Sequence, residues 1–416
     1  MTAEEYCVRV FDGTHDTPKP VDEGKLLITS KNISSGDLDF TDAYFISEED
    51  YKEVNKRSQV QQWDILFSMI GTVGNVYIEE NQEISYAIKN MGVFSCQDEY
   101  KAKWLYYYLQ SPYFKKLLNH QLSGAIQKFA PLGWLRSIDV PEFTEDKKII
   151  VDKLQAIDKK IALNRRMNAS IEKMAKELYD YWFVQFDFPD SDGKPYKSSG
   201  GSMVYNECLK REIPEGWECK QVKDLIEPIE RGISYSSEDL LDPEAMPMIS
   251  LVNFDKKGEY RNEEIKTFSG DYSESQTVSE FDMLIASTDM TRNADIIGTP
   301  IFVTSEFEKA LFTMDLVKIT PNNLVKKAYI YYTLKTDFYH NYIKPFASGT
   351  NVMHLNVQGV LDYTLSLPDA VIQTKFENVI KPFKKLQFKN INEIKKLTSL
   401  RNYLLPMLMN NQAKII

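Results

Sequence analysis

Apolar residues recur with two different periods along the chain, and the changes of period divide it into four segments. From Asp146 to about Trp182 the steps alternate between four and three residues, which is the spacing of a coiled-coil seam. No Gly or Pro occurs between Asp146 and Phe188, so we predict one long helix here. The predicted seam consists of Ile150, Leu154, Ile157, Ile161, Asn164, Asn168, Ile171, Ala175, Leu178 and Trp182.

A second helical pattern occupies the C-terminal part of the chain. Because proline starts helices more readily than it continues them, we expect the regular helix to begin near Pro382. Two such seams in one chain bury each other most readily, so we expect an antiparallel pair that holds the globular domains at opposite ends. A helix of about 37 residues spans roughly 55 Å. The simpler alternative is that both helices are core elements of two compact domains. The second seam consists of Phe376, Ile380, Phe383, Gln387, Asn390, Ile394, Leu397, Arg401, Leu404 and Leu408.

Short strand-like runs and helical stretches fill the two remaining segments. In the first segment we predict strands at Lys25–Thr29, Ile65–Met69 and Val73–Ile78, and a helix near Lys101–Leu118. A stretch rich in Asp, Gly, Pro and Ser follows the first long helix and predicts a flexible linker. We therefore expect an α+β protein with a globular domain at 1–145, a helical region at 146–186, a linker at 187–212, a second globular domain at 213–368 and a C-terminal helical region at 369–416.

The two globular segments repeat each other. Trp104–Gly124 aligns without a gap on Tyr329–Gly349, with identities that include two adjacent tyrosines and a Ser-Gly pair. Nearly the same offset aligns Leu27–Ile33 with Met248–Phe254, and it aligns the Asp-apolar-Leu triplets that begin at residues 64 and 282. A repeat this long is a duplicated domain, because solenoid repeats have periods of about 20 to 50 residues. Two similar halves suit a target that is itself bipartite.

Composition narrows the choice of function. The chain carries 50 basic and 60 acidic residues, a formal charge of −10, which argues against a free-standing, non-specific DNA-binding protein. Local basic surfaces, or partners that supply phosphate contacts, remain compatible with this charge. No apolar run approaches the ~18 residues of a membrane span, and no secretory signal is visible. The four cysteines show no C-x-x-C spacing, so we expect no zinc site and free thiols in a reducing cytoplasm; they are Cys7, Cys96, Cys208 and Cys219.

No group of residues forms a recognisable catalytic motif. The phosphate loop G-x-x-x-x-G-K-[ST], the zinc motif H-E-x-x-H and the nucleophile elbow are all missing, as are the Asn-Pro-Pro-Tyr and Asp-Pro-Pro-Tyr motifs of amino-methyltransferases. Gly71–Gly74 is better explained as a β-turn than as a phosphate loop. Asp190 and Lys194 lie in the predicted linker, where no second carboxylate is held in place for nuclease chemistry. We therefore expect a chain without catalytic residues, bound cofactor or metal.

The repeated loops carry side chains that suit DNA recognition. Base edges are recognised by paired donors and acceptors, while Lys, Arg and backbone amides contact phosphates. The repeated tyrosines are better explained as helix core, because leucines neighbour them at helical spacing. The loops differ where the framework repeats, as two readers of different sequences require. The candidate DNA-contacting residues are Lys31, Asn32, Thr72, Asn75, Gln127, Lys128, Arg136, Asn253, Arg292, Asn293, Thr350, Asn351 and His354.

Four segments are characteristic beside the alternation of globular domain and long helix, which occurs twice. They are Trp63–Asn75, Ser123–Ile138 followed by Pro141, Gly193–Gly201 and Ile213–Trp217. Together with this domain order they resemble the specificity subunit of type I restriction-modification systems. Two departures are visible: the first half has only Glu4–Val8 where the second half has Ile213–Trp217, and the loop 287–299 lacks the usual Gly-x-x-Gly.

The resemblance implies a specific mode of action. Each globular domain would be a target recognition domain that binds one half of a split, asymmetric site in double-stranded DNA. The two helices, related by a pseudo-twofold axis, would set the gap between half-sites and dock two methylation subunits. Those subunits would bind S-adenosylmethionine, and up to two restriction subunits would cleave DNA using ATP. The alternatives are a cytoplasmic scaffold that binds proteins through the duplicated domains and, more weakly, an enzyme with an unrecognised site.

Overall fold

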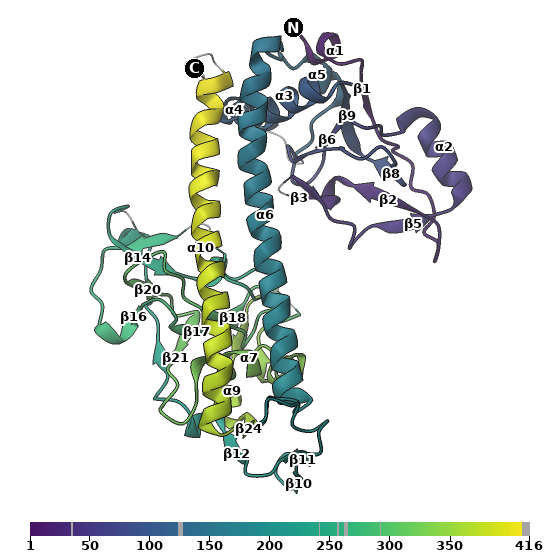
Figure 1. Cartoon of the computed structure of the whole chain (residues 1–416). Helices are drawn as coiled ribbons and strands as arrows, with labels where there is room; N and C mark the ends of the chain where they lie inside the picture. The colour runs from purple at the N-terminus through teal and green to yellow at the C-terminus, as the bar shows by residue number, and fades with distance from the viewer. Residues whose placement is uncertain are drawn as a thin grey trace. The chain divides into compact units, whose positions relative to one another are not determined.

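The computed structural model describes residues 1–409 apart from Ser35, Leu241, Arg292 and the ranges 124–127, 256–257 and 262–264. Its internal contacts divide the chain into two compact units, Met1–Lys160 with Leu397–Ile416 and Ile161–Lys396. Two long helices, α6 (Lys148–Tyr179) and α10 (Ala370–Met409), contribute residues to both units (Figure 1).

The first unit contains two main sheets. One has the antiparallel order β1-β9-β6-β7, and the other has the order β5-β2-β8, in which β2 is parallel to β8. Its strands are β1 (Arg9–Asp12), β2 (Lys25–Thr29), β3 (Ile33–Ser34), β4 (Asp37–Leu38), β5 (Tyr44–Ile46), β6 (Asp64–Ser68), β7 (Val76–Ile78), β8 (Tyr86–Lys89) and β9 (Met91–Ser95). Its shorter helices are α1 (Ala3–Tyr6), α2 (Glu48–Ser58), α3 (Glu99–Gln110), α4 (Pro112–Leu122) and α5 (Leu132–Ser137).

Strand β6 lies at the centre of the first unit. Because successive side chains of a strand point to opposite faces, Ile65 and Phe67 join the core that holds Trp104 of α3, whereas Leu66 joins the core of the second sheet. The single helix expected near Lys101–Leu118 is in fact two helices. Ser111 separates them because its hydroxyl accepts a hydrogen bond from the Phe114 amide and so caps α4.

The second unit repeats the framework of both sheets and adds a fourth strand, β16, beside β20. Its four-stranded sheet β13-β21-β17-β19 matches the first sheet, and β15-β14-β20 matches the second, including the parallel pair β14 and β20. The duplication predicted from the sequence is therefore confirmed. The strands are β13 (Glu230–Arg231), β14 (Met246–Ile249), β15 (Lys266–Phe268), β16 (Thr277–Val278), β17 (Met283–Ala286), β19 (Pro300–Phe302), β20 (Ala310–Phe312) and β21 (Leu316–Ile319).

Further elements of the second unit surround this framework. The helices α7 (Lys327–Thr333), α8 (Asp337–Ile343) and α9 (Gln358–Asp362) follow β21 as α3, α4 and α5 follow β9. The additional strands are β10 (Met203–Asn206), β11 (Arg211–Pro214), β12 (Glu218–Gln221), β18 (Thr288–Asp289), β22 (Ala347–Ser348), β23 (Met353–Leu355) and β24 (Thr364–Leu367).

The two long helices pair antiparallel within each unit, as the seams predict. In the second unit, polar members of the seams meet: Asn168 Oδ1 accepts from Asn390 Nδ2 at 2.8 Å, and Asn164 Nδ2 donates to Glu393 at 2.8 Å. In the first unit, Ile150 and Leu154 share a core with residues of α10 near Leu408. A buried polar pair lowers stability but fixes the register of two helices.

Helix α10 begins well before Pro382, so the expected starting point was wrong. Asp369 Oδ1 accepts hydrogen bonds from the amides of Val371 and Ile372 at 2.9 and 3.0 Å, which starts the helix there. A proline inside a helix costs about 3 kcal/mol. Burial of apolar side chains such as Phe376 and Ile380 contributes roughly 1.5–3 kcal/mol each and offsets that cost.

The segment after α6 is folded, which corrects the expectation of a flexible linker. A π-helical turn, Asp180–Val184, ends the long helix. Asp187 then accepts hydrogen bonds from the amide and hydroxyl of Ser198 at 2.8 and 2.6 Å, and the ring of Phe188 stacks on Tyr196 at 4.7 Å. The residues that suggested flexibility therefore form tight turns.

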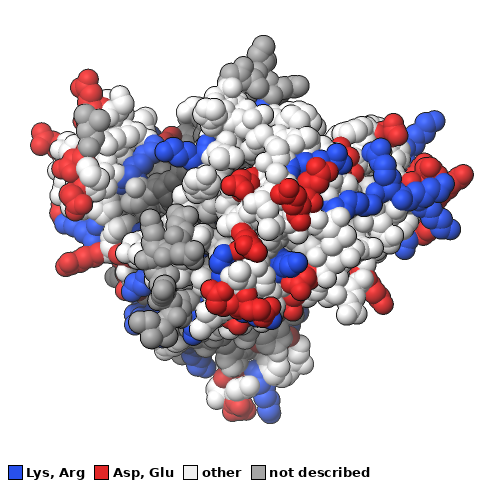
Figure 2. Space-filling view, turned by 90° about the horizontal axis from the view of Figure 1, so that it is seen from above, with Lys and Arg blue, Asp and Glu red and all other residues white. Residues whose placement is uncertain are grey.

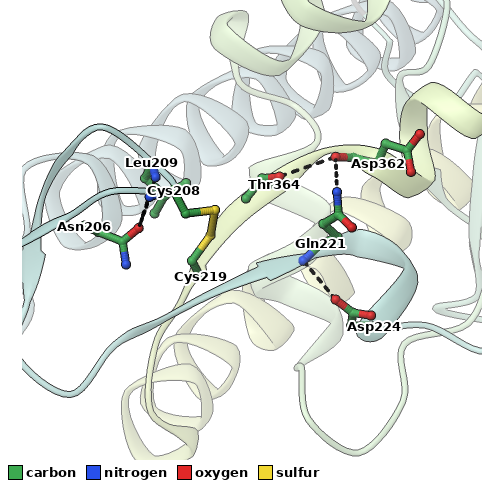
Figure 3. The surroundings of a disulfide bond; sticks show 8 residues. All are labelled: Asn206, Cys208, Leu209, Cys219, Gln221, Asp224, Asp362 and Thr364. Carbon is green, nitrogen blue, oxygen red and sulfur yellow. Dashed lines mark hydrogen bonds between the residues drawn. A yellow bond between two sulfur atoms is a disulfide. The ribbon is translucent and has the colours of Figure 1, made fainter.

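Two of the four cysteines form a disulfide, which corrects the expectation of four free thiols. Cys208 lies in the turn of the β10–β11 hairpin and Cys219 lies on β12, and the hairpin brings their Cα atoms to 6.6 Å (Figure 3). Asn206 Oδ1 fixes this turn by accepting from the amides of Cys208 and Leu209 at 3.1 and 3.0 Å. Cys7 and Cys96 remain buried thiols in the first unit.

Candidate nucleic-acid interface

Two pairs of loops occupy equivalent places in the two units. In the first unit, the loop after β6 meets the chain before α5 through an antiparallel bridge between Ile70 and Phe129. In the second unit, β18 and β23 bring together the equivalent segments, and there Thr288 pairs with His354. The offset from Phe129 to His354 is the offset that aligned the tyrosine helices. The same backbone therefore presents different side chains in the two units.

The described candidates of the first unit fall on or near these loops. Thr72 and Lys128 are exposed beside the Ile70–Phe129 bridge, and Lys31 is exposed on the 3₁₀ turn that follows β2. Asn75 and Arg136 are half-buried: the Asn75 amide donates to the Ile33 carbonyl at 2.9 Å, and Arg136 Nε donates to the Val10 carbonyl at 3.1 Å. These two residues thus also support the fold.

Most candidates of the second unit come together around the β18–β23–β22 sheet. Thr350 and Asn351 are exposed on the segment that joins β22 to β23, His354 is exposed on β23 itself, and Asn293 is exposed on the loop after β18. The buried carboxylate of Asp289 folds this loop by accepting from the amides of Thr291 and Ile296, both at 2.7 Å. A carboxylate thus organises the loop that lacks the Gly-x-x-Gly of the first half. Candidates Gln127 and Arg292 lie outside the described residues.

Asn32 and Asn253 have a structural role, which corrects their assignment as DNA-contacting residues. Both side chains are buried. Asn32 Oδ1 accepts from the Thr29 amide at 2.8 Å and its Nδ2 donates to the Asp39 carbonyl at 2.8 Å. Asn253 repeats this geometry, because its Oδ1 accepts from the Ser250 amide at 2.9 Å. The two asparagines fix equivalent 3₁₀ turns, so their match in the repeat reflects the framework.

Sequence reasoning missed a polar cluster at the edge of the first unit. His15 contacts Asn90 through Nδ1 at 2.9 Å and Asp12 through Nε2 at 3.0 Å. The Asn90 carbonyl in turn accepts from the hydroxyl of Ser30, which precedes Lys31. The cluster therefore adjoins the candidate loops. Only an alignment carried through the whole repeat could have pointed to it, since no short motif contains these residues.

A repeated turn precedes the central strand of each unit. Trp63 and Phe281 both adopt positive φ, 68° and 66°, and each is followed by an aspartate whose Oδ2 accepts a backbone amide three residues back at 2.9 Å. Asp282 also lies 3.2 Å from the ammonium of Lys327. Asp64 is fully buried, and this burial raises its pKa to about 6. Burial thus penalises the charged form of Asp64.

Replacing Asp64 by the isosteric asparagine is expected to stabilise the protein at high pH. Because the folded-state pKa is raised, the wild type gains stability as pH falls through about 6 and loses it above that value. Asp64→Asn should therefore raise the free energy of unfolding at pH 8 by roughly 1–3 kcal/mol, and by little at pH 3, below the ordinary pKa of 3.8. Urea unfolding at both values measures this. Asp282→Asn, which removes an ion pair, should give no such gain, and equal effects of Asp64→Asn at both pH values would contradict the explanation.

A buried charge cluster supports the second unit beneath its loops. Lys335 of the α7–α8 turn contacts Glu172 of α6 at 3.2 Å and also pairs with Glu259. Lys384 of α10 lies 2.5 Å from Glu172. Burial acts to raise the pKa of Glu172, but the two ammonium groups outweigh it and hold the pKa at about 2. The cluster therefore ties the loop that contains Glu259 to both long helices.

The first unit has a smaller counterpart of this cluster. Tyr107 donates to Asp158 of α6 at 2.9 Å, and Arg401 of α10 donates to the same carboxylate at 2.8 Å. Tyr332, which the repeat aligns with Tyr107, donates to Glu172 at 3.4 Å. In both units α6 contributes the carboxylate and α10 contributes the positively charged side chain. The repeated tyrosines are thus helix residues that join each domain to the helices, in agreement with their interpretation as core.

The described residues were searched for metal-binding clusters and for helices that could span a membrane. No group of three or more His, Cys, Asp or Glu side chains in this part could hold a metal ion. Among the same residues, no helix is both long and apolar enough to cross a membrane. On the face drawn in Figure 2, basic and acidic side chains are interspersed.

Comparison with known proteins identifies the class of the first domain. Residues 19–173 match the model of the type I restriction modification DNA specificity domain. The type I restriction enzyme MjaIX specificity subunit of Methanocaldococcus jannaschii is 23% identical over 385 residues, which cover 89% of this chain and 82% of that protein. The HindI specificity subunit of Haemophilus influenzae is 23% identical over 317 residues, 66% of this chain and 69% of that protein.

The fold agrees with this class. The crystal structure of the S subunit of a type I restriction-modification system from M. genitalium superposes with a TM-score of 0.56, covering 98% of this chain and 95% of that one at 14% identity. Residues 19–173 therefore match a type I restriction modification DNA specificity domain, and the chain is similar to type I specificity subunits along most of its length. The resemblance inferred from the sequence is therefore confirmed.

Proposed function

We propose that this chain is the non-catalytic DNA-recognition subunit of a type I restriction-modification complex, in which each globular domain binds one half of a bipartite, asymmetric site. The observation that carries the proposal is the pair of equivalent bridges, Ile70–Phe129 and Thr288–His354. A shared backbone with different exposed side chains suits two readers of different base sequences.

The proposed DNA-contacting surface lies on these loops. Lys and Arg side chains neutralise phosphates, whereas amide, hydroxyl and imidazole groups can pair with base edges. Two of the candidates, Gln127 and Arg292, lie outside the described residues, and Asn32 and Asn253 are excluded because they are buried. The proposed contacts are therefore Lys31, Thr72, Asn75, Lys128, Arg136, Asn293, Thr350, Asn351 and His354.

Each long helix exposes apolar side chains outside the seam that could contact partner helices. On α6, Leu163 and Met174 are exposed and lie about three helical turns apart, so they share one face. On α10, Val379 and Leu386 are exposed and lie one heptad apart. None of these residues belongs to the seam between the two helices. Exposed apolar side chains that share one face occur at protein interfaces, which supports docking of two methylation subunits.

The partners would supply the chemistry and much of the charge. In this proposal the methylation subunits bind S-adenosylmethionine and modify adenine, and up to two restriction subunits would use ATP to cleave DNA. The interspersed charges of Figure 2 and the net charge of −10 favour partners that contribute phosphate contacts. The register-fixing pairs of the helices, such as Asn168 with Asn390, suit a spacer of fixed length between half-sites.

Methylome sequencing of cells with and without this chain tests the proposed function. We expect a bipartite, asymmetric adenine-methylation motif in the presence of the chain and its complete loss on deletion, with other methylated motifs unchanged. Restoring the chain on a plasmid should restore the same motif. An unchanged methylome, with the methylation subunits present in both strains, would exclude the proposal.

A further inference from the structure

A second pair of turns has the same backbone hydrogen bonds in the two domains. In the first, the Thr14 amide donates to the Ile88 carbonyl and the Asn90 amide donates to the Thr14 carbonyl, both at 3.1 Å. In the second, Ile233 makes the same pair of bonds with Phe312 and Met314, both at 2.8 Å. Asn90 and Met314 therefore occupy the same place in the framework.

The 3₁₀ turns held by Asn32 and Asn253 supply a neighbouring equivalent pair. The residue before the asparagine is Lys31 in the first unit and Val252 in the second, and both are exposed. In the second unit this turn follows β14, whose last residue, Ile249, accepts the amide of Thr313 at 2.9 Å. Val252 and Met314 thus come from adjoining turns.

At these two equivalent turns the exposed side chains are apolar in the second unit and polar in the first. Met314 and Val252 are 56% and 40% exposed, and Met290, on the loop after β18, is 77% exposed. The Ser287 hydroxyl donates to the Met314 carbonyl at 3.5 Å, which brings that loop to the same region. In the first unit the equivalent residues are Lys31 and Asn90, and Asn90 is paired with His15.

At the bridge between the loops the polarity is reversed. There the first unit is apolar, because Ile70 and Phe129 are 44% and 41% exposed. The second unit has the exposed His354 at the place of Phe129, whereas Thr288, at the place of Ile70, is buried. Each domain therefore exposes one apolar patch on its candidate DNA-contacting loops, and the two patches lie at different positions of one framework. Scattered exposed apolar residues are ordinary, but an exchange of polarity at matched positions, such as Phe129 with His354, suits contacts with different groups.

We propose that these apolar patches contact the C5-methyl groups of thymine, with Ile70 and Phe129 acting on the half-site of the first domain and Val252, Met290 and Met314 on the half-site of the second. The inference rests on the proposed function. The thymine methyl is the apolar group that B-DNA displays in its major groove, and contact with it distinguishes T·A from the other pairs. Because the patches lie at different positions, they place the methyl contact at different base pairs of the two half-sites.

Deoxyuridine, which is thymine without this methyl, gives a direct test. The chain with its methylation subunits is bound to duplexes that carry the methylated motif, with thymines replaced by deoxyuridine in one half-site at a time. Loss of a buried methyl should weaken binding about 3- to 10-fold at the contacted position in each half-site. Deoxyuridine in the spacer between half-sites is the control and should have no effect.

Two substitutions assign the effect to the patches. Met314→Asn and Phe129→His each install the residue that the same framework carries in the other domain, so folding should be retained, and thermal unfolding of each variant verifies this. Met314→Asn should remove the deoxyuridine effect in one half-site only, and Phe129→His should remove it in the other half-site only.

Specific outcomes would overturn the inference. These are a half-site without A·T pairs, deoxyuridine binding as tightly as thymine in both halves, or a folded Met314→Asn variant that keeps the full deoxyuridine effect. A hydrophobic wedge between base steps would also be distinguished, because it would respond to the substitutions and not to deoxyuridine. In each case, specific binding of the thymine duplex would still support the proposed function. Failure of the thymine-methyl inference can therefore be told apart from failure of the proposed function.

Discussion

Lys335→Met is expected to destabilise the protein by about 2–4 kcal/mol, because it leaves two partly buried carboxylates with one cation. Lys335 contacts both Glu172 and Glu259, and its side chain is largely buried. Without it, the charge of Glu259 would be desolvated beside the like charge of Glu172. Urea unfolding at pH 7 measures the loss. Lys309→Met removes an exposed ion pair with Glu274 and serves as the matched control, with no measurable change expected.

The acid side of the unfolding profile provides an independent test of the same cluster. The pKa of Glu172 is held at about 2 in the folded state, below its ordinary value of 4.5. Its contribution to stability is therefore complete above about pH 4.5 and is lost as pH falls toward 2. Glu172→Gln should lower stability at pH 6 and flatten the dependence between pH 5 and pH 3. A variant that keeps the wild-type slope would show that other groups dominate acid unfolding.

Exchanging the first globular domain is expected to change one half of the recognised site and leave the other half intact. The exchange replaces residues 1–145 with the corresponding domain of another type I specificity subunit and rejoins the chain before α6. Asp158 and Arg401 remain on the helices, so an incoming domain that has a tyrosine at the place of Tyr107 can make the same junction. The second domain and its loops are untouched. A bidentate base contact contributes about 1–3 kcal/mol, so an exchanged reader should abolish modification of the original site.

The sequence predicted the larger features because each rests on a repeated, local signal. The seams of α6 and α10 followed from apolar spacing, and the duplication followed from aligned residues such as Tyr107 and Tyr332. The start of α10 was misjudged because Pro382 is a local signal that the cap at Asp369 and tertiary burial override. The folded segment after α6 was missed because turn-forming residues look alike in tight turns and flexible linkers.

The candidate site was predicted less completely, for a physical reason. Candidate DNA-contacting residues were selected as polar side chains in loops. The side chains of Asn32 and Asn253 are nevertheless buried and hydrogen-bonded to the backbone, which only the fold reveals. Apolar residues such as Phe129 and Met314 were passed over because exposure cannot be read from identity. Once the strands are paired, the equivalence of Phe129 with His354 becomes visible, and with it the exchange of polarity between the domains.

Methylome sequencing of cells that carry the chain with residues 1–145 exchanged tests modular recognition most directly. We predict a new bipartite motif in which one half-site and the spacer length are those of the parent chain and the other half-site is that of the donor. The unexchanged chain, expressed in the same strain, provides the reference motif. A motif in which both half-sites differ from those of the parent would contradict recognition by two independent domains.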